Sequence, residues 1–329
     1  MPMRQTRRRF LTTLSLAGAA GFLRAPRVLA SKGALETTTV RLVADYSICS
    51  PVLLSEELLR AEGFTDVRYV ERTVDRAPQP LASAPVDFRL ISPWAVARRI
   101  DVGEPITVLG GLHVGCYELF AREGVRNVAD LKGRSVGFSN AMDLLALMAA
   151  QVGLDPVNDI RWVTDRALKQ IELFAAGKLD VFLAFPPDAQ ELRARHVGHV
   201  ILNTTMDRPW SQYFCCMLAG NREYVQNYPV ATKRVLRAIL KAAEFCASEP
   251  GHAAQRLVDG GFTDRYDYAF ETLRDIPYDR WHDYDAADSI RSYALRMHEV
   301  GFNKSSPQKI IADGTDWRFL EEVKRELKA

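Results

Sequence analysis

The sequence predicts an α/β fold with two lobes, and three observations lead to that prediction. From Thr38 onward, short runs rich in β-forming residues alternate with helical stretches. Residues 86–93 and 179–186 share Asp, Leu and Pro at matching offsets, each as a strand that ends in a Pro-led turn. This weak repeat indicates two similar lobes, although any two buried strands can look this alike. After residues 214–219 the sequence is almost wholly helical, and we expect this tail to pack on the first lobe.

The expected elements follow in order along the chain. Strands are predicted where apolar runs lie between turn residues, at 40–44, 67–70, 86–91, 106–111, 135–138, 160–163, 179–184, 200–202 and 214–219. Helices are predicted from apolar spacing and Pro-led starts, at 51–61, 93–99, 142–152, 168–176 and 188–195. Residues 75–84 are rich in Pro and Ala, which predicts a loop or a broken helix.

Residues 1–30 predict a twin-arginine signal peptide. Thr6–Leu11 reads TRRRFL, and the apolar run from Phe10 to Leu23 is too short and too rich in Ala and Gly to remain in a bilayer. Val28–Ala30 supplies compact residues for cleavage, so we expect the mature chain to begin near Ser31. An ordinary secretory signal is the alternative. Both routes predict export to the periplasm, without a lipid anchor.

The charge balance argues against nucleic acid as a partner. Six of the 43 basic residues and none of the 41 acidic residues lie in the first thirty positions, which leaves a net charge of −4 beyond them. The remaining basic residues are scattered rather than clustered. No later stretch reaches the roughly 18 apolar residues of a membrane helix. We therefore expect an exported protein of two lobes that is not embedded in the membrane.

The five cysteines are too few and too dispersed for a disulfide framework, although one disulfide remains open. In a regular strand Cys215 and Cys216 would point to opposite faces, which argues against a bond between them. No CxxC or HExxH spacing occurs, so we expect no structural zinc site and no cofactor.

Three segments together resemble one family. They are residues 128–137 (VADLKGRSVG), residues 173–181 (LFAAGKLDV) and residues 221–224 (NREY) before a long helix. In this order they are similar to the periplasmic solute-binding proteins of the nitrate, sulfonate and taurine transporters, a superfamily that also includes thiamine-pyrimidine precursor proteins. The resemblance runs across essentially the whole chain beyond the signal.

The resemblance implies a type II periplasmic binding protein fold, with two α/β lobes, two crossover strands and a ligand cleft between the lobes. Residues 38–117 plus 213–329 would form lobe one, and residues 118–212 lobe two. It implies a monomer, not an enzyme, that captures a small organic anion or heterocycle for an ABC-transporter permease in the inner membrane. A module that senses a ligand for a membrane receptor would share these features.

Ligands of open α/β sheets bind beyond the carboxyl ends of the strands, and this rule selects the candidate site. The candidate ligand-binding residues, which are mostly hydroxyl, amide or aromatic side chains, are Tyr46, Ser47, Ser92, Trp94, His113, Cys116, Ser139, Asn140, Met142, Phe185, Trp210 and Tyr213. We expect Ser139 or Asn140 to cap the helix that begins near Met142, whose free N–H groups would suit an anion. The aromatic residues favour an organic solute, such as a sulfonate, a carboxylate or a pyrimidine, over a bare inorganic ion.

The cysteines and His113 leave chemical alternatives open. His113 and Cys116, at the expected crossover, could orient a ligand, bind a metal, or act as a base with its nucleophile, and either could be a structural residue. The thiamine-pyrimidine synthases carry an iron-associated cysteine-rich stretch in this part of the fold, where the present chain has only Cys215 and Cys216. A metal-using or cofactor-using enzyme is therefore the alternative to a binding protein.

Overall fold

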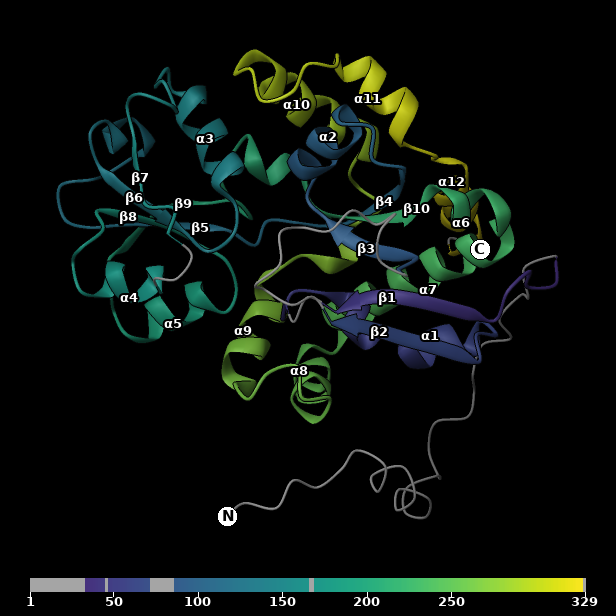
Figure 1. Ribbon diagram of the computed structural model, residues 1–329. Coiled ribbons are helices and arrows are strands. Elements are labelled where there is room, and N and C mark those ends of the chain that lie inside the picture. The colour runs from purple at the N-terminus through teal and green to yellow at the C-terminus, as the bar shows by residue number, and fades with distance from the viewer. Residues whose placement is uncertain (1–32, 45–46, 72–85, 166–168, 328–329) are drawn as a thin grey trace. The chain divides into compact units, whose positions relative to one another are not determined.

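The computed structural model describes residues 33–44, 47–71, 86–165 and 169–327. Residues 35–329 form one compact unit, and the description below concerns that unit. It contains two separate five-stranded sheets with helices packed on them (Figure 1). The predicted α/β class with two lobes is thus confirmed. Tyr46 and the predicted segment 75–84 lie outside the described residues.

The first sheet has the strand order β2-β1-β3-β10-β4. Its strands are β1 (Thr39–Ala44), β2 (Asp66–Glu71), β3 (Phe88–Ile91), β4 (Ile106–Val114) and β10 (Phe214–Asn221). β1 pairs in parallel with β2 and β3, whereas β10 runs antiparallel between β3 and β4. All nine residues of β4 are buried, as expected for a strand covered by helices on both faces. This sheet and its helices are called the first lobe below.

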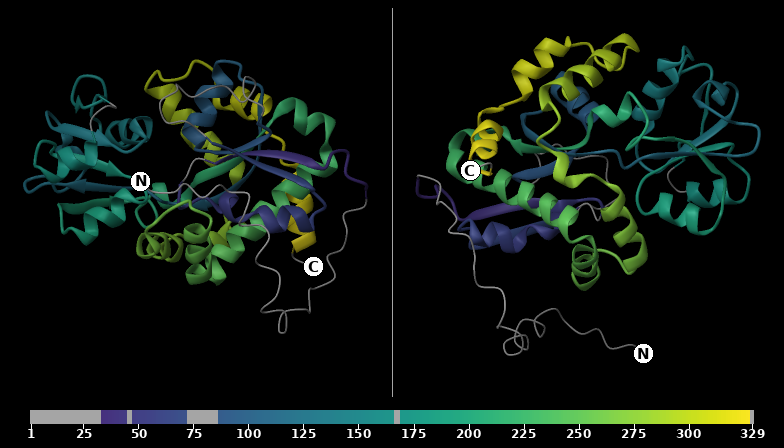
Figure 2. Two further views of the ribbon diagram at one scale, coloured as in Figure 1. Left: turned by 60° about the horizontal axis from the view of Figure 1, so that its bottom comes forward. Right: turned by 180° about the vertical axis from the view of Figure 1, so that it is seen from behind.

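The second sheet has the order β7-β6-β8-β5-β9. Its strands are β5 (Glu118–Ala121), β6 (Ser135–Phe138), β7 (Arg161–Trp162), β8 (Val181–Ala184) and β9 (His199–Asn203). Helix α3 (Met142–Gln151) lies on one face, and α4 (Gln170–Ala175) and α5 (Asp188–Ala194) lie on the other (Figure 1). This sheet and its helices are called the second lobe. Figure 2 shows it, in teal, beside the first lobe in two further views.

The remaining helices belong to the first lobe. Those before β4 are η2 (Pro51–Leu54), α1 (Glu56–Ala61) and α2 (Pro93–Asp101). Those after β10 are α6 (Arg222–Asn227), α7 (Pro229–Ser248), α8 (Pro250–Asp259), α9 (Tyr266–Asp275), η5 (Tyr278–Arg280), α10 (Ala286–Glu299), α11 (Pro307–Gly314) and α12 (Arg318–Leu327). α7, α11 and α12 contact β4, and α10 contacts α2. The helical tail therefore packs on the first lobe, as the sequence predicts.

The chain passes between the sheets twice, once between Val114 and Glu118 and once between Asn203 and Phe214. The short helices η3 (Val128–Leu131) and η4 (Trp210–Gln212) lie after β5 and within the second crossing. The carboxyl ends of β1, β3 and β4 and the start of β10 lie at one edge of the first sheet, because β10 runs opposite to the others. Within the described residues, no helix is both long and apolar enough to span a bilayer.

Several elements differ from the prediction. β4 extends to Val114, so His113 lies within the strand and not beyond its end. The predicted helix 51–61 is divided, because the backbone N–H and the hydroxyl of Ser55 both donate to the carbonyl of Val52 and close a 3-10 turn before α1 begins. Strand β5 was not predicted, because it has only four residues, begins with the acidic Glu118 and follows β4 after three residues. It nevertheless pairs with both β8 and β9, in the interior of the second sheet.

Candidate functional site

The two lobes contact each other through charged side chains on both sides of the crossings. On one side Arg98 of α2 pairs with Asp143 of α3 at 3.1 Å. On the other side Arg193 of α5 lies 3.2 Å from Glu271 and 3.5 Å from Asp275, both on α9. Each contact joins a helix of the first lobe to a helix of the second. Residues between these helices are therefore enclosed by both lobes.

Among the residues that the structure describes, six aromatic side chains meet between the lobes, and they are called the aromatic cluster below. Four are predicted site residues and two, Tyr117 and Tyr293, were not among them; the six are Trp94, Tyr117, Phe185, Trp210, Tyr213 and Tyr293. Ring centroids lie 5.8 Å apart for Trp94 and Tyr117 and 4.9 Å apart for Tyr117 and Phe185. These distances are those of favourable edge and tilted ring pairs. Four aromatic residues that the strand-end rule selected therefore lie in one cluster.

Tyr293 of α10 is the centre of the first-lobe part of this cluster. Its ring lies 5.3 Å from Trp94, 6.0 Å from Tyr213 and 6.2 Å from Trp210. The strand-end rule could not select it, because it lies on a helix of the tail. The signal that marks it as buried is its place on the apolar face of α10, with Ile290 and Met297 at helical spacing.

Ser139 and Asn140 do not cap helix α3, so that prediction is wrong. The N-cap of α3 is Ala141, which makes no side-chain cap hydrogen bond. Ser139 instead donates its hydroxyl to Asp188 at 2.5 Å and accepts the N–H of Phe185 at 3.0 Å. The side-chain oxygen of Asn140 accepts the hydroxyl of Tyr117 at 2.8 Å. Both polar groups are used to join the strand ends of the second lobe to the aromatic cluster.

The other predicted residues lie near the same place with differing roles. Ser92 is the N-cap residue of α2, without a side-chain bond to that helix. Met142 is half-buried at the first position of α3. The hydroxyl of Ser47 lies 3.1 Å from the sulfur of Cys49.

A cavity of about 340 Å³ opens beside Tyr117, within the range of small-molecule sites. The residues of both lobes that line it are Cys116, Tyr117, Glu118, Pro186, Ala189, Gln190, Arg193, Asn203, Thr205, Met206, Thr272, Asp275 and Ile276. It is called the interlobe pocket below. Of the predicted residues in the described chain, Cys116 alone lines it. The residues on α5 and α9 were missed because they lie on helices that the strand-end rule does not reach.

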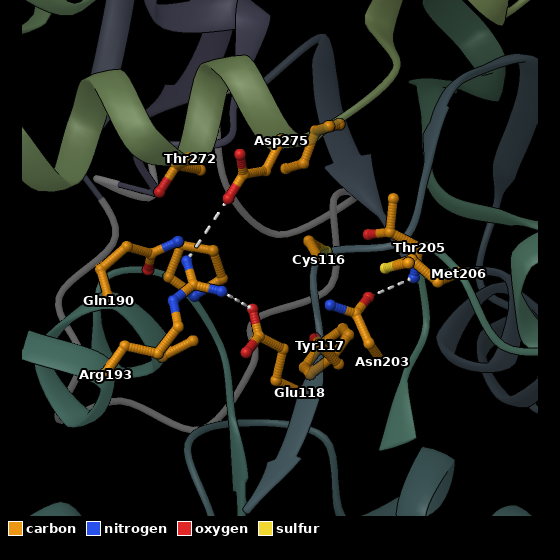
Figure 3. A pocket seen from close by; sticks show the side chains of 13 residues that line it. Cys116, Tyr117, Glu118, Gln190, Arg193, Asn203, Thr205, Met206, Thr272 and Asp275 are labelled. Carbon is orange, nitrogen blue, oxygen red and sulfur yellow. Dashed lines mark hydrogen bonds and ion pairs between the residues drawn. The ribbon is translucent and has the colours of Figure 1, made fainter. Parts of the chain in front are cut away.

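Arg193 is the main charged group of the interlobe pocket. Figure 3 shows its guanidinium between the carboxylates of Glu118 and Asp275, and its closest partner is Glu118. Next to it, the side-chain oxygen of Gln190 is buried and forms no hydrogen bond with any described residue, and the same holds for Nε of Arg193. Two residues that line this pocket therefore each carry a buried polar atom, an acceptor and a donor, without a hydrogen-bond partner among the described residues.

Two acidic groups at the interlobe contacts have shifted pKa values. Burial raises the pKa of Glu118 above its usual range, and Arg193 opposes the shift. Burial likewise raises the pKa of Asp143, with Arg98 acting in the opposite direction. In both cases the desolvation of the carboxylate outweighs its attraction to the arginine, so the folded state disfavours the charged form of each carboxyl.

Four cysteines and a histidine gather where the chain first leaves the first sheet, and they are called the thiol–imidazole cluster. Its members come from three separate segments and are Cys49, His113, Cys116, Cys215 and Cys216. The ligand atoms of Cys49, His113 and Cys216 lie within 4.8 Å of one another, as do those of Cys116, Cys215 and Cys216. Cys116 and Cys215 are free thiols whose sulfurs lie 2.6 Å apart. Burial opposes the shift, but hydrogen bonds from Cys116 and Cys216 lower the pKa of Cys215 to about 7.

Cys215 and Cys216 place their sulfurs on the same side, contrary to the expectation for a regular strand. The pairing of β10 with β4 shifts in register between Phe214 and Cys216 and again before Met217. Such a bulge breaks the alternation of side chains along the strand. Both sulfurs can therefore lie within 4.8 Å of Cys116.

The two α/β sheets, joined by two crossings with an enclosed contact between them, define the periplasmic binding protein fold. The family model described as NMT1/THI5 like matches residues 60–253. Since this is more than half of the chain, the protein belongs to the NMT1/THI5-like family.

Solved structures support this fold. The alkanesulfonate-binding protein SsuA from Xanthomonas axonopodis pv. citri, bound to MOPS, is 17% identical, with a TM-score of 0.69 over 86% of this chain and 100% of that one. The periplasmic nitrate-binding protein NrtA from Synechocystis PCC 6803 is 16% identical, with a TM-score of 0.71 over 90% of each chain. The desulfurization enzyme DSZB, at 14% identity and a TM-score of 0.61, covers 88% of this chain and 99% of its own. The fold therefore occurs in binding proteins and in an enzyme.

A curated relative, described as a binding protein of Brucella abortus, is 24% identical over 176 residues. The match covers 52% of this chain and 54% of the relative, so the chain spans about half the length of the curated relatives it matches.

Proposed function

We propose that the protein is the periplasmic solute-binding component of an ABC importer, which captures a small organic solute between its lobes and delivers it to a membrane permease. The observation that carries the proposal is the convergence of rings from both lobes: Trp94 of the first lobe, Tyr117 of the crossing and Phe185 of the second lobe. A site divided between two lobes is suited to closing on its ligand by rotation at the crossings. Such a function requires binding but no reaction.

Within the classes that the sequence favours, the charges favour a heterocycle of pyrimidine type over a sulfonate or carboxylate. Arg193 and Arg98 at the interlobe contacts already pair with carboxylates. An anion at either place would have to displace a carboxylate or lie beside it. A flat ring could instead stack on Tyr117 and direct its polar edge to the unpartnered atoms of Gln190 and Arg193.

Thermal unfolding of the purified chain against a panel of pyrimidines, sulfonates, carboxylates and inorganic anions tests the proposal. A ligand at about 100 times its dissociation constant should add about 2.7 kcal/mol to the free energy of unfolding. Small-angle scattering on the same samples should show compaction with the stabilising compound. We expect the stabilising compound to be a heterocycle. Silence across the panel, without compaction, would contradict the binding function, and a sulfonate as sole ligand would contradict the preferred class.

The alternative of a metal-using or cofactor-using enzyme has one specific observation in its favour, the thiol–imidazole cluster beside the interlobe pocket. Turnover of a stabilising compound, followed by mass spectrometry, separates the two functions. A binding protein returns the compound unchanged.

A further inference from the structure

The thiol–imidazole cluster is more than a set of packed cysteines, because its ligand atoms converge from segments far apart in the sequence. Cys49 follows β1, His113 lies in β4, and Cys216 lies in β10. Cys49, His113, Cys116 and Cys215 are buried, with exposed fractions of 6% or less. The three atoms of each triad lie within 4.8 Å of one another. A shared ion with bonds of about 2.0 to 2.3 Å would draw the wider pairs together and move apart the sulfurs of Cys116 and Cys215, which lie 2.6 Å from each other.

The imidazole of His113 is arranged as a metal ligand. Its Nδ1 lies 3.2 Å from the carbonyl of Val114, and since a carbonyl only accepts, Nδ1 carries the proton. In the neutral imidazole, Nε2 then presents its lone pair. That atom is buried without a hydrogen-bond partner among the described residues, and it lies beside the thiols of Cys49 and Cys216. Histidines that bind metals usually donate their other N–H in this way.

The backbone is distorted at the points that bring the sulfurs together. Cys116 has a φ of +104°, which is costly for a residue other than glycine. The bulge in β10 turns Cys215 and Cys216 to the same side. On the far side, the hydroxyl of Tyr278 donates to the carbonyl of Cys49 at 2.9 Å and holds that segment in place.

We propose that the thiol–imidazole cluster is a binding site for one thiophilic metal ion, Zn²⁺ or Cu⁺, with Cys216 as the ligand common to both triads. Thiolate and imidazole donors suit these ions, whereas Mg²⁺ and Ca²⁺ prefer oxygen. The ion would join the segment after β1 to the end of β4, to the first crossing and to the start of β10. The search for short sequence motifs misses such a site, because its ligands are not neighbours in the sequence.

The test uses the full chain, reduced and handled without oxygen, with Zn²⁺ or Cu⁺ supplied alone. After dialysis, elemental analysis should find one ion per chain in the unmodified protein and in Cys246→Ala. Cys246 is the matched control, because it is a buried cysteine outside both triads. Cys216→Ala should weaken retention by at least about 10- to 100-fold, the loss seen when even an indirect partner of a metal ligand is removed.

A second measurement does not depend on how well a variant folds. Co²⁺ added to the unmodified chain should produce thiolate-to-cobalt charge-transfer absorption, which zinc then removes. The proposal is overturned if the reduced chain retains neither Zn²⁺ nor Cu⁺, if Cys216→Ala retains as much metal as Cys246→Ala, or if the cobalt spectrum shows no sulfur ligand. The proposal is independent of the solute, so metal retention without any solute effect would overturn the proposed function alone.

Discussion

Replacing Arg193 by alanine should loosen the contact between the lobes. Arg193 pairs with Glu118 of its own lobe and lies 3.2 Å from Glu271 and 3.5 Å from Asp275 on the other lobe. The Glu118 side chain is 10% exposed and that of Arg193 is 30% exposed. The contact is therefore intermediate between a surface ion pair and a fully buried one.

The expected magnitude follows from this intermediate burial. Breaking a fully buried pair costs about 3 to 5 kcal/mol, because one charge is left unpaired, whereas exposed pairs contribute about 0 to 1 kcal/mol. For Arg193→Ala we expect a loss of about 2 kcal/mol in the interlobe contact and in the solvation of Glu118. If the whole loss destabilises the arrangement in which the lobes are in contact, the ratio of molecules with closed lobes to molecules with open lobes drops by roughly 30-fold, since 1.4 kcal/mol is a factor of ten.

Small-angle scattering and urea unfolding of the ligand-free chain measure the two parts of this loss. Arg193→Ala should increase the radius of gyration and lower the urea midpoint. Arg195→Ala is the matched control, because the partners of Arg195 among the described residues are Glu172 and Glu191 of the second lobe, on the surface. It should leave the radius unchanged and cost about 0 to 1 kcal/mol. The reasoning is refuted if the two variants behave alike.

Two further predictions concern the crossing itself. The Glu118→Gln variant should be more stable than the unmodified protein near pH 7 and should lose that advantage below about pH 4. The pKa of Glu118 is raised in the folded state, so the folded protein favours the protonated carboxyl and loses stability as the pH rises through the shifted range. Arg193 keeps its α9 partners in the variant, and urea midpoints that move in the opposite direction would contradict the shift. The Gly115→Ala variant should lower the free energy of unfolding more than Gly124→Ala does. Both glycines have a positive φ, but a Cβ at Gly115 would lie 2.1 Å from the hydroxyl oxygen of Thr205, whereas a Cβ at Gly124 has no atom within 4 Å. Equal unfolding midpoints would show that backbone strain, and not crowding, determines the loss.

The sequence predicted the class of fold and the edge of the sheets where the lobes meet. Runs of β-forming residues with Pro-led turns mark strands and their ends. This local pattern selected Trp94 and Phe185, whose rings both contact Tyr117 in the structure. The strand-end rule selects only residues that follow strands, so it did not select Arg193 on α5 or Tyr293 on α10. Their positions depend on how α5 and α10 pack, which no local pattern specifies.

The cysteines show a second limit. Regular alternation along a strand assigns Cys215 and Cys216 to opposite faces, but the bulge against β4 overrides it. A bulge arises from pairing with a distant strand and leaves no trace in the strand's own sequence. The convergence of the thiols around Cys116 was therefore not predictable from spacing.

The position of β10 has a consequence for the order in which the chain folds. β10 fills the gap between β3 and β4, yet about a hundred residues separate it from β4 in the sequence. During synthesis the second lobe is complete once β9 has emerged, whereas the edges of β3 and β4 that will pair with β10 are still open. The lobe that begins first is thus finished last, and until residue 221 is made its open edges are exposed to mispairing.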